Sequence, residues 1–398
     1  MGLLGRLEKP GRLVGIDLAR TLALVGMIAT HVIAARDAAD EVTLAHQIAS
    51  GRASALFAVL AGLSMALVSG GRRPLAAGEL RRARLGLAAR AVLIGALGLA
   101  LGDLDTGLAV ILPAYALLFL LALPFLGLAA RPLLVIAAVW VVAAPALSQV
   151  VRPLLPERSY ENPMFADLAS PGRLLADLLF TGYYPAAAWL AYLLVGLALG
   201  RLDLRGLRTP LLLATIGSGA AITAFAISRL ATSLASVREA IIPTAGPVSE
   251  ASVLDILADN QFGSTPTGGS WAWLLVVSPH SATPLDLAHT IGTSVAVIGL
   301  CLALAHLWPR RIRPLLVLLA GAGAAPLTCY VIHLLMRTPE VPPAEVPGVL
   351  GVHLGVVLGV GAVIALSGRR GPLESVVGLP GRLLQARARL TRPDAPTR

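Results

Sequence analysis

The chain has 398 residues, of which 56% are hydrophobic and only 14% are charged. A soluble globular domain carries about 25% charged residues, so this composition excludes an ordinary soluble enzyme and predicts a protein with several membrane spans. The net charge of +10 at pH 7 requires no nucleic-acid partner, because an excess of basic residues on one side of a membrane accounts for it.

Apolar runs recur along the whole sequence, from the N-terminal region to the C-terminal region. A membrane-spanning helix needs about 20 mainly apolar residues. Ten segments meet this length, at residues 13–35, 48–69, 83–102, 106–129, 131–151, 181–200, 209–231, 283–307, 314–336 and 346–367. The sequence therefore predicts an all-α polytopic membrane bundle of about ten transmembrane helices.

Basic residues are distributed unevenly over the connections between these segments. If the N-terminus is cytoplasmic, the connections on that side hold 22 Lys and Arg, against seven on the opposite side. Short cytoplasmic loops concentrate Lys and Arg, so both termini are expected in the cytoplasm. The basic, amphipathic stretch at 381–393 is expected to lie along the inner membrane surface.

Two long connections fall on the outer side in this topology, at residues 152–180 and 232–282. Connections of this length in compact proteins often form binding loops or lids. The second is expected to contain a short helix at 249–260, "SEASVLDILADN".

The first predicted helix carries three costly polar residues. Asp17 and Arg20 are spaced i,i+3, and His31 lies on the same face about three turns further on. Ionisable groups inside a membrane helix mark a pathway or a site by default. Asp17 and Arg20 are expected near the cytoplasmic end and His31 near the outer end. The alternative is a self-neutralising pair at one interface and an interfacial histidine at the other.

Further polar residues fall at the same outer end on this topology: His46, Arg52, Asp103, Asp105, Tyr183, Tyr184, His280, Asp286, His289 and His333. Imidazoles beside carboxylates are suited to general-base chemistry near neutral pH. Alternatives remain open for individual members, since the tyrosines are also typical of an interfacial aromatic belt and the aspartates of a solvated turn.

Several familiar motifs are absent from the sequence. It has no HExxH and no paired cysteines, since Cys301 and Cys329 lie in separate apolar runs, so no metal cofactor is expected. It also has no Walker A loop or nucleophile elbow. "GAGAAPL" at 321–327 is interpreted as a close-packing segment rather than a phosphate loop.

Seven stretches, in order along the chain, resemble the YeiB-like bacterial membrane proteins. The N-terminal half is similar to the catalytic domain of heparan-alpha-glucosaminide N-acetyltransferase. The stretches are "RLVGIDLARTLALVGMIATHV", "GRASALFAVLAGLSMAL", "ILPAYALLFLLALPFL", "TGYYPAAAWLAYLLVGLALGRLDL", "SPHSATPLDLAHTIGTSVAVIGLCL", "LTCYVIHL" and "RRGPLESV". The resemblance divides one integral membrane domain into an acyltransferase-like half at 1–230, the outer loop at 231–282, a YeiB-like half at 283–375 and a basic tail at 376–398.

The resemblance implies a transmembrane acyltransferase of the bacterial plasma membrane. Such relatives take acetyl groups from cytosolic acetyl-CoA and acetylate an amino sugar on the far side, where a histidine is implicated in catalysis. In those relatives an Asn ends the first helix and the histidine follows in the next loop. Here His31 stands at the Asn position and His46 is the nearest equivalent of the loop histidine, at a different spacing.

The expected mechanism uses a base, a group that orients it and donors for the oxyanion. His31 or His46 is the expected base, Asp103 or Asp286 the orienting group, and Arg52, Tyr183 or Tyr184 the donor. An acyl-histidine intermediate is the alternative route. The full set of catalytic candidates is His31, His46, Asp103, Asp286 and His289; substrate contacts are expected from Tyr183, Tyr184, His280 and His333.

The acyl-CoA cosubstrate is expected near Asp17, Arg20, Arg52 and Arg90, because guanidinium groups bind phosphates well. Expected partners are membrane lipids and a cell-envelope glycan or other polar acceptor; homodimer formation is left open. Two other functions compete with acyl transfer. One is secondary transport or export of a small polar molecule, and the other is a non-catalytic envelope or sensor protein.

Overall fold

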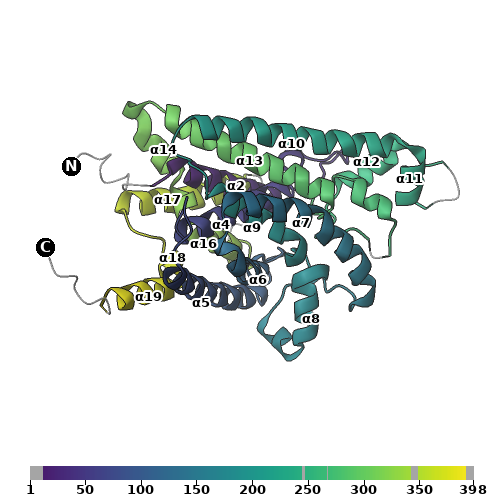
Figure 1. Ribbon diagram of the computed structural model, residues 1–398. Coiled ribbons are helices and arrows are strands. Elements are labelled where there is room, and N and C mark those ends of the chain that lie inside the picture. The colour runs from purple at the N-terminus through teal and green to yellow at the C-terminus, as the bar shows by residue number, and fades with distance from the viewer. Residues whose placement is uncertain (1–11, 244–246, 267, 342–347, 391–398) are drawn as a thin grey trace.

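The computed structural model describes residues 12–243, 247–266, 268–341 and 348–390. Over these residues the chain is an all-helical bundle (Figure 1), and its one β-type contact is an isolated bridge between Arg36 and Val42. The predicted all-α class is therefore confirmed.

Seven of the predicted segments form helices long and apolar enough to cross a membrane. They are α2 (Val14–Val32), α3 and α4 together (Leu44–Ala49 and Arg52–Val68), α5 (Ala77–Gly102), α7 (Ala130–Val151, extended by η2, Arg152–Leu154), α10 (Arg208–Ser233), α13 (Pro284–Leu307) and α17 (Val349–Ser367). The chain is thus a multi-pass membrane protein by length and composition.

The other three predicted segments are helical but short, bent or broken. The first consists of α6 (Leu112–Ala122) and η1 (Leu123–Gly127). In the second, α8 (Pro171–Ala176) and η4 (Asp177–Thr181) lead through a 57° bend into α9 (Ala186–Leu199). The third is divided into α14 (Arg313–Leu319), α15 (Gly321–Ala324) and α16 (Pro326–Leu335). Proline begins or interrupts these pieces because it lacks the amide proton that a continuing helix needs. Within the described part of the chain, length therefore supports seven spans, or eight with the bent pair. The expected total of about ten and the cytoplasmic placement of both termini stay predictions.

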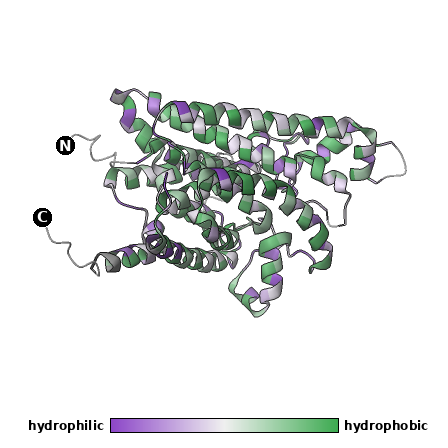
Figure 2. Ribbon diagram, in the orientation of Figure 1, coloured by the Kyte–Doolittle hydropathy of each residue, from purple (hydrophilic) through white to green (hydrophobic). Residues whose placement is uncertain are grey.

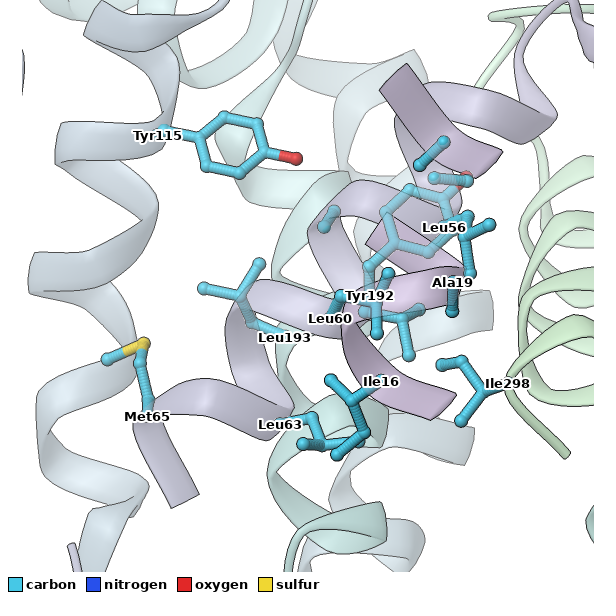
Figure 3. Packing of buried hydrophobic residues seen from close by; sticks show 14 of the residues in the cluster. Ile16, Ala19, Leu56, Leu60, Leu63, Met65, Tyr115, Tyr192, Leu193 and Ile298 are labelled. Atoms are coloured by element: carbon cyan, nitrogen blue, oxygen red, sulfur yellow. The ribbon is translucent and has the colours of Figure 1, made fainter. Parts of the chain in front are cut away.

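The core of the bundle lies where α2, α4, α9 and α13 meet. Figure 3 shows Ile16 and Ala19 of α2 close to side chains of α4, with Leu193 of α9 and Ile298 of α13 nearby. Every residue of α9 is buried. Gly196 packs directly against the α4 backbone, where a Cβ atom would collide with the Val59 carbonyl, so the helices approach as small-residue membrane helices do.

The "GAGAAPL" segment also packs closely, as expected. A Cβ atom on Gly323 would overlap the Asp17 carbonyl oxygen of α2, and the Gly323 amide donates to the Thr21 hydroxyl at 2.9 Å. Gly321 makes the same kind of approach to Gly361 of α17. This crossing brings α16 and α17 alongside α2.

The peripheral helices expose apolar side chains. Val135 and Val139 of α7, Ile216 and Ile222 of α10 and Val363 of α17 are all more than 60% exposed. Figure 2 shows α10 mostly in the colours of hydrophobic residues along its length. These faces suit contact with lipid tails, because water-facing helices carry a polar stripe instead.

The two long connections fold at one end of the bundle. They form η3 (Phe165–Ala169), α11 (Ala235–Ile241), α12 (Glu250–Ala258) and η5 (Trp271–Leu275). The short helix expected at 249–260 is α12, and its N-terminus is capped by the Ser249 hydroxyl. The opposite end carries η6 (Arg310–Ile312), α18 (Pro372–Val377) and α19 (Leu379–Leu390), which packs on α5 (Figure 1).

Candidate functional site

Three cavities of the bundle are lined by predicted site histidines or arginines, and they are called here the histidine cavity, the arginine cavity and the side cavity. The histidine cavity, of about 580 Å³, opens at the end where the long connections fold. It brings together seven of the polar residues that the sequence placed at the outer end: His31, His46, Asp103, Asp105, Tyr183, Tyr184 and His280. The sequence predicted only that these residues lie at a similar depth in the membrane. In the structure they also line one cavity.

His46 has a defined tautomer in this cavity. Its Nε2 lies 3.0 Å from the Ile33 carbonyl oxygen, and a carbonyl only accepts hydrogen bonds, so Nε2 carries the proton. Nδ1 is therefore the nitrogen that can accept a proton. The segment from α2 into α3 supplies both partners, which fixes the imidazole by a contact local in sequence.

His280 has the opposite tautomer. The Gly51 amide donates to its Nε2 at 3.2 Å, so Nδ1 carries the proton and is a hydrogen-bond donor. Burial, with a smaller contribution from His46, lowers the pKa of His280 from 6.5 to about 4. The backbone at His280 is left-handed, with φ of 59°, an uncommon conformation for a non-glycine residue that often marks a functional site.

His31 faces the cavity from the end of α2 and is bonded to another histidine behind it. Its Nδ1 lies 3.1 Å from Nε2 of His333, and the two rings are stacked. Nδ1 of His333 lies 2.9 Å from Nδ1 of His353 on α17. His333 itself is 1% exposed and is absent from the cavity lining, so the predicted substrate contact is replaced by a contact with His31.

The wall of the histidine cavity is acidic and aromatic. Its charged lining residues, among those described, are Asp103, Asp105 and Glu161, and its aromatic ones are Tyr160, Tyr183, Tyr184, Phe262 and Tyr330. Within the described residues no carboxylate hydrogen-bonds to an imidazole, so the base-orienting role expected of Asp103 or Asp286 has no counterpart in a direct bond. Backbone groups and other imidazoles hold the histidines instead.

Arg52, Asp286 and His289 line a separate side cavity of about 290 Å³, which shares His46 with the histidine cavity. Arg52 Nε donates to His289 Nε2 at 3.1 Å, and His289 Nδ1 lies 3.0 Å from the Ala221 carbonyl. Both ring nitrogens of His289 are therefore occupied. Asp286 is 3% exposed and accepts a bond from the Ala282 amide.

The arginine cavity, of about 250 Å³, lies deeper in the bundle and has mainly apolar walls. Its charged lining residues, within the described part of the chain, are Arg20, Arg90 and Glu374. Asp17 accepts from Arg20 at 2.7 Å and from Arg12 at 2.6 Å, so it holds Arg20 and does not line the cavity. Arg52, predicted with this group, lies instead with His289, because it begins α4 at the far end.

Arg20 and Arg90 present guanidinium groups to this cavity. Arg20 also donates to the Ser64 hydroxyl at 2.7 Å. The buried Nε of Arg90 has no hydrogen-bond partner among the described residues. Burying an unpaired cationic nitrogen is costly, so this position suits an anionic ligand.

Three side chains line both the histidine cavity and the arginine cavity: Met27, Ile111 and Tyr330. Tyr330 Oη accepts a bond from the Ile111 amide at 3.3 Å. These three residues are called here the divider, because they border the histidine cavity on one side and the arginine cavity on the other. Its members come from α2, the residue before α6, and α16.

Glu374 and Tyr330 were not among the residues selected from sequence. Glu374 lies in the "RRGPLESV" stretch, and its carboxylate accepts bonds from the Leu327 amide at 2.7 Å and the Thr328 amide at 3.1 Å. It thus caps the N-terminus of α16, the helix that carries Tyr330 and His333. The acid in an otherwise basic stretch was the only signal available for it.

Residues 12–231 match the model of a protein family described as "Heparan-alpha-glucosaminide N-acetyltransferase, catalytic". No curated protein matched the chain. The matched region covers α2 to α10 and includes His31, His46, Arg20 and Arg90; His280, Tyr330, His333 and Glu374 come from the part of the chain beyond the match.

Proposed function

Because the chain belongs to the family of heparan-alpha-glucosaminide N-acetyltransferase catalytic domains, we propose that it is a transmembrane acyltransferase. It transfers an acyl group from acyl-CoA in the arginine cavity to an acceptor in the histidine cavity. The observation that carries this proposal is the divider, since two cavities of complementary chemistry share Met27, Ile111 and Tyr330.

The arginine cavity suits the donor. Arg20 and Arg90 supply positive charge for phosphate groups, which guanidinium binds in charge-assisted hydrogen bonds. The apolar walls suit the acyl chain and its thioester arm. The Asp17 carboxylate keeps Arg20 in place, at 2.7 Å. On the charge asymmetry of the loops this cavity faces the cytoplasm, where acyl-CoA is made.

The histidine cavity suits an acceptor with an amino or hydroxyl group. Asp103, Asp105 and Glu161 attract a cationic amine, and the tyrosines offer the flat faces on which a sugar ring stacks. An amino sugar of the cell envelope combines both features. The acceptor enters from the outer face of the bacterial plasma membrane in this topology.

A cationic amine first gives up one proton to solvent, because an ammonium nitrogen has no lone pair. The neutral amine, or a hydroxyl acceptor, then loses one further proton as it attacks the thioester carbonyl. The new bond joins the acceptor nitrogen or oxygen to the acyl carbon, the carbon–sulfur bond breaks, and the proton ends on the CoA sulfur. Among the described residues, His31 Nε2 and His46 Nδ1 have no hydrogen-bond partner, so these two nitrogens are the proposed base positions. The neutral His280, through Nδ1–H, supplies a donor for the developing oxyanion.

The direct test is acyl transfer by purified protein in liposomes loaded with radiolabelled acetyl-CoA. With an amino sugar added outside, label is expected on the sugar. Loss of transfer in both His31→Ala and His46→Ala supports the site. Intact transfer in both variants rules the site out, and absence of label on any amine or hydroxyl acceptor rules the function out.

Transport is the competing function, and one feature favours it. The ninth predicted span is broken between α14, α15 and α16, and α8 and α9 meet at a 57° bend. Broken helices at membrane depth are typical of transporter binding sites. Amino-sugar flux across the same liposomes without acyl-CoA would select transport over transfer.

A further inference from the structure

Three histidines from three helices form a continuous chain of hydrogen bonds. His31 of α2 bonds to His333 of α16 at 3.1 Å, and His333 bonds to His353 of α17 at 2.9 Å. His333 and His353 are each 1% exposed. His31 lines the histidine cavity, so the chain runs from the cavity into the protein.

Each of these contacts joins two ring nitrogens, so one nitrogen of each pair carries the proton. When the three rings are neutral, the chain has two consistent proton arrangements. In the first, His31 Nδ1–H donates to His333, and His333 Nδ1–H donates to His353, which leaves His31 Nε2 unprotonated. In the second, every bond is reversed and His31 Nε2 carries a proton.

We propose that His31 is the base of the acyl transfer and that His333 and His353 relay its proton; this rests on the proposed function. His31 Nε2 takes the proton of the acceptor while Nδ1–H passes to His333 Nε2. His333 Nδ1–H then passes to His353 Nδ1, so the positive charge leaves the cavity. The reverse sequence delivers a proton from His31 Nε2 to the departing CoA sulfur, and the three rings return to neutral.

The surroundings of the chain fit transient occupancy. The Arg337 guanidinium repels a proton added to any of the three rings. That repulsion favours release of the added proton, which suits a relay that gives it back. The buried Nε2 of His353 has no hydrogen-bond partner among the described residues, so the chain ends there.

A purely structural role explains the arrangement less well. Buried imidazoles within membrane helices are costly, and apolar side chains would fill the same space between α2, α16 and α17. His333 and His353 lie beyond the region that matches the family. The C-terminal part of the chain therefore supplies His333 and His353, which act through His31, and His31 lies in the part that matches the family.

The decisive variant is His353→Asn. Asparagine keeps an acceptor for His333 Nδ1–H and so preserves alignment, but it cannot take up a proton. We expect kcat to fall about 10-fold or more, with KM for both substrates unchanged and with the acid limb of kcat/KM moved to lower pH. His306→Asn, at an exposed position in the last turn of α13, is the matched control and keeps wild-type kinetics. Unchanged kcat in His353→Asn overturns the relay.

A readout independent of activity separates this inference from the proposed function. Nitrogen-15 NMR of histidine-labelled protein in bilayers distinguishes protonated from unprotonated ring nitrogens. In His353→Asn the ring shifts of both His333 and His31 are expected to change, while those of His46 remain. Unchanged His31 and His333 shifts overturn the chain itself. Absence of acyl transfer in the wild-type protein overturns the proposed function together with the base role of His31.

Discussion

Tyr330 accepts a hydrogen bond from the Ile111 amide at 3.3 Å, and both side chains line the arginine cavity and the histidine cavity. The contact spans 219 residues of sequence, and it joins the family-matched region to the C-terminal part of the chain. It belongs to the divider that the proposed route from donor to acceptor must pass.

Tyr330→Phe removes the hydroxyl that pairs with the buried Ile111 amide. An unsatisfied buried amide costs about 1–3 kcal/mol, so the melting temperature is expected to fall and kcat to fall with it, because the divider loosens. The measurement is thermal unfolding in detergent beside steady-state kinetics. Trp271→Phe, on an exposed aromatic residue outside the cavities, is the control. A wild-type melting temperature in Tyr330→Phe would contradict the bond.

Arg20→Gln and Arg90→Gln remove the charge of the arginine cavity. Each is expected to raise the KM for acetyl-CoA about 10-fold or more, which corresponds to ~1.4 kcal/mol of binding free energy. The KM for the acceptor should not change. Arg73→Gln, on an exposed connection, leaves both constants unchanged. An equal rise in the KM for acetyl-CoA and the KM for the acceptor would contradict a role of the two guanidinium groups in binding the donor.

His280 makes stability depend on pH in a defined direction. Its pKa is lowered from 6.5 to about 4 by burial, so protonation favours the unfolded state. The stabilising contribution of the neutral ring is complete above pH 6.5 and declines as the pH falls to about 4, by at most roughly 3 kcal/mol.

The check is thermal unfolding between pH 4 and 7 for the wild-type protein and His280→Gln. Glutamine keeps an acceptor for the Gly51 amide but does not titrate, so its melting temperature is expected to fall less over this interval. Parallel curves for the two proteins would show that His280 is not the group responsible.

Glu374→Gln tests the cap on α16. The carboxylate accepts from the Leu327 and Thr328 amides, and hydrogen bonds to a charged group contribute about 1.5–3 kcal/mol. The expected result is a lower melting temperature together with a lower kcat, because α16 carries Tyr330. Glu79→Gln, at the start of α5, serves as a second acidic-to-amide substitution away from the cavities. A stable Glu374→Gln protein with normal kcat would contradict this role.

The sequence predicted the depth of the site residues better than their partners. The hydrophobic runs and the spacing of Arg20 and His31 predicted that these residues lie near opposite ends of one helix. In the structure they line different cavities. Helical periodicity does not say which helices become neighbours. The contact between His31 and His333, 302 residues apart, could not be derived from it.

Arg52 is a residue whose neighbours the sequence did not predict. Its residue type suited phosphate binding, but it begins α4, and its guanidinium donates to His289 at 3.1 Å. Pro124 and Pro326 stand at the starts of η1 and α16. A proline in the sequence indicates where a helix can break, but the directions of the broken pieces depend on tertiary packing. The number of bilayer crossings depends on those directions, so it stays a prediction.

The most direct test of the account is a structure of the full chain in lipid with a non-hydrolysable acetyl-CoA analogue. The account predicts density for phosphate groups at Arg20 and Arg90, with the acyl carbonyl at the divider beside Tyr330 and within reach of His31. Analogue bound in the histidine cavity or on the lipid-facing surface, with the arginine cavity unfilled, would contradict it.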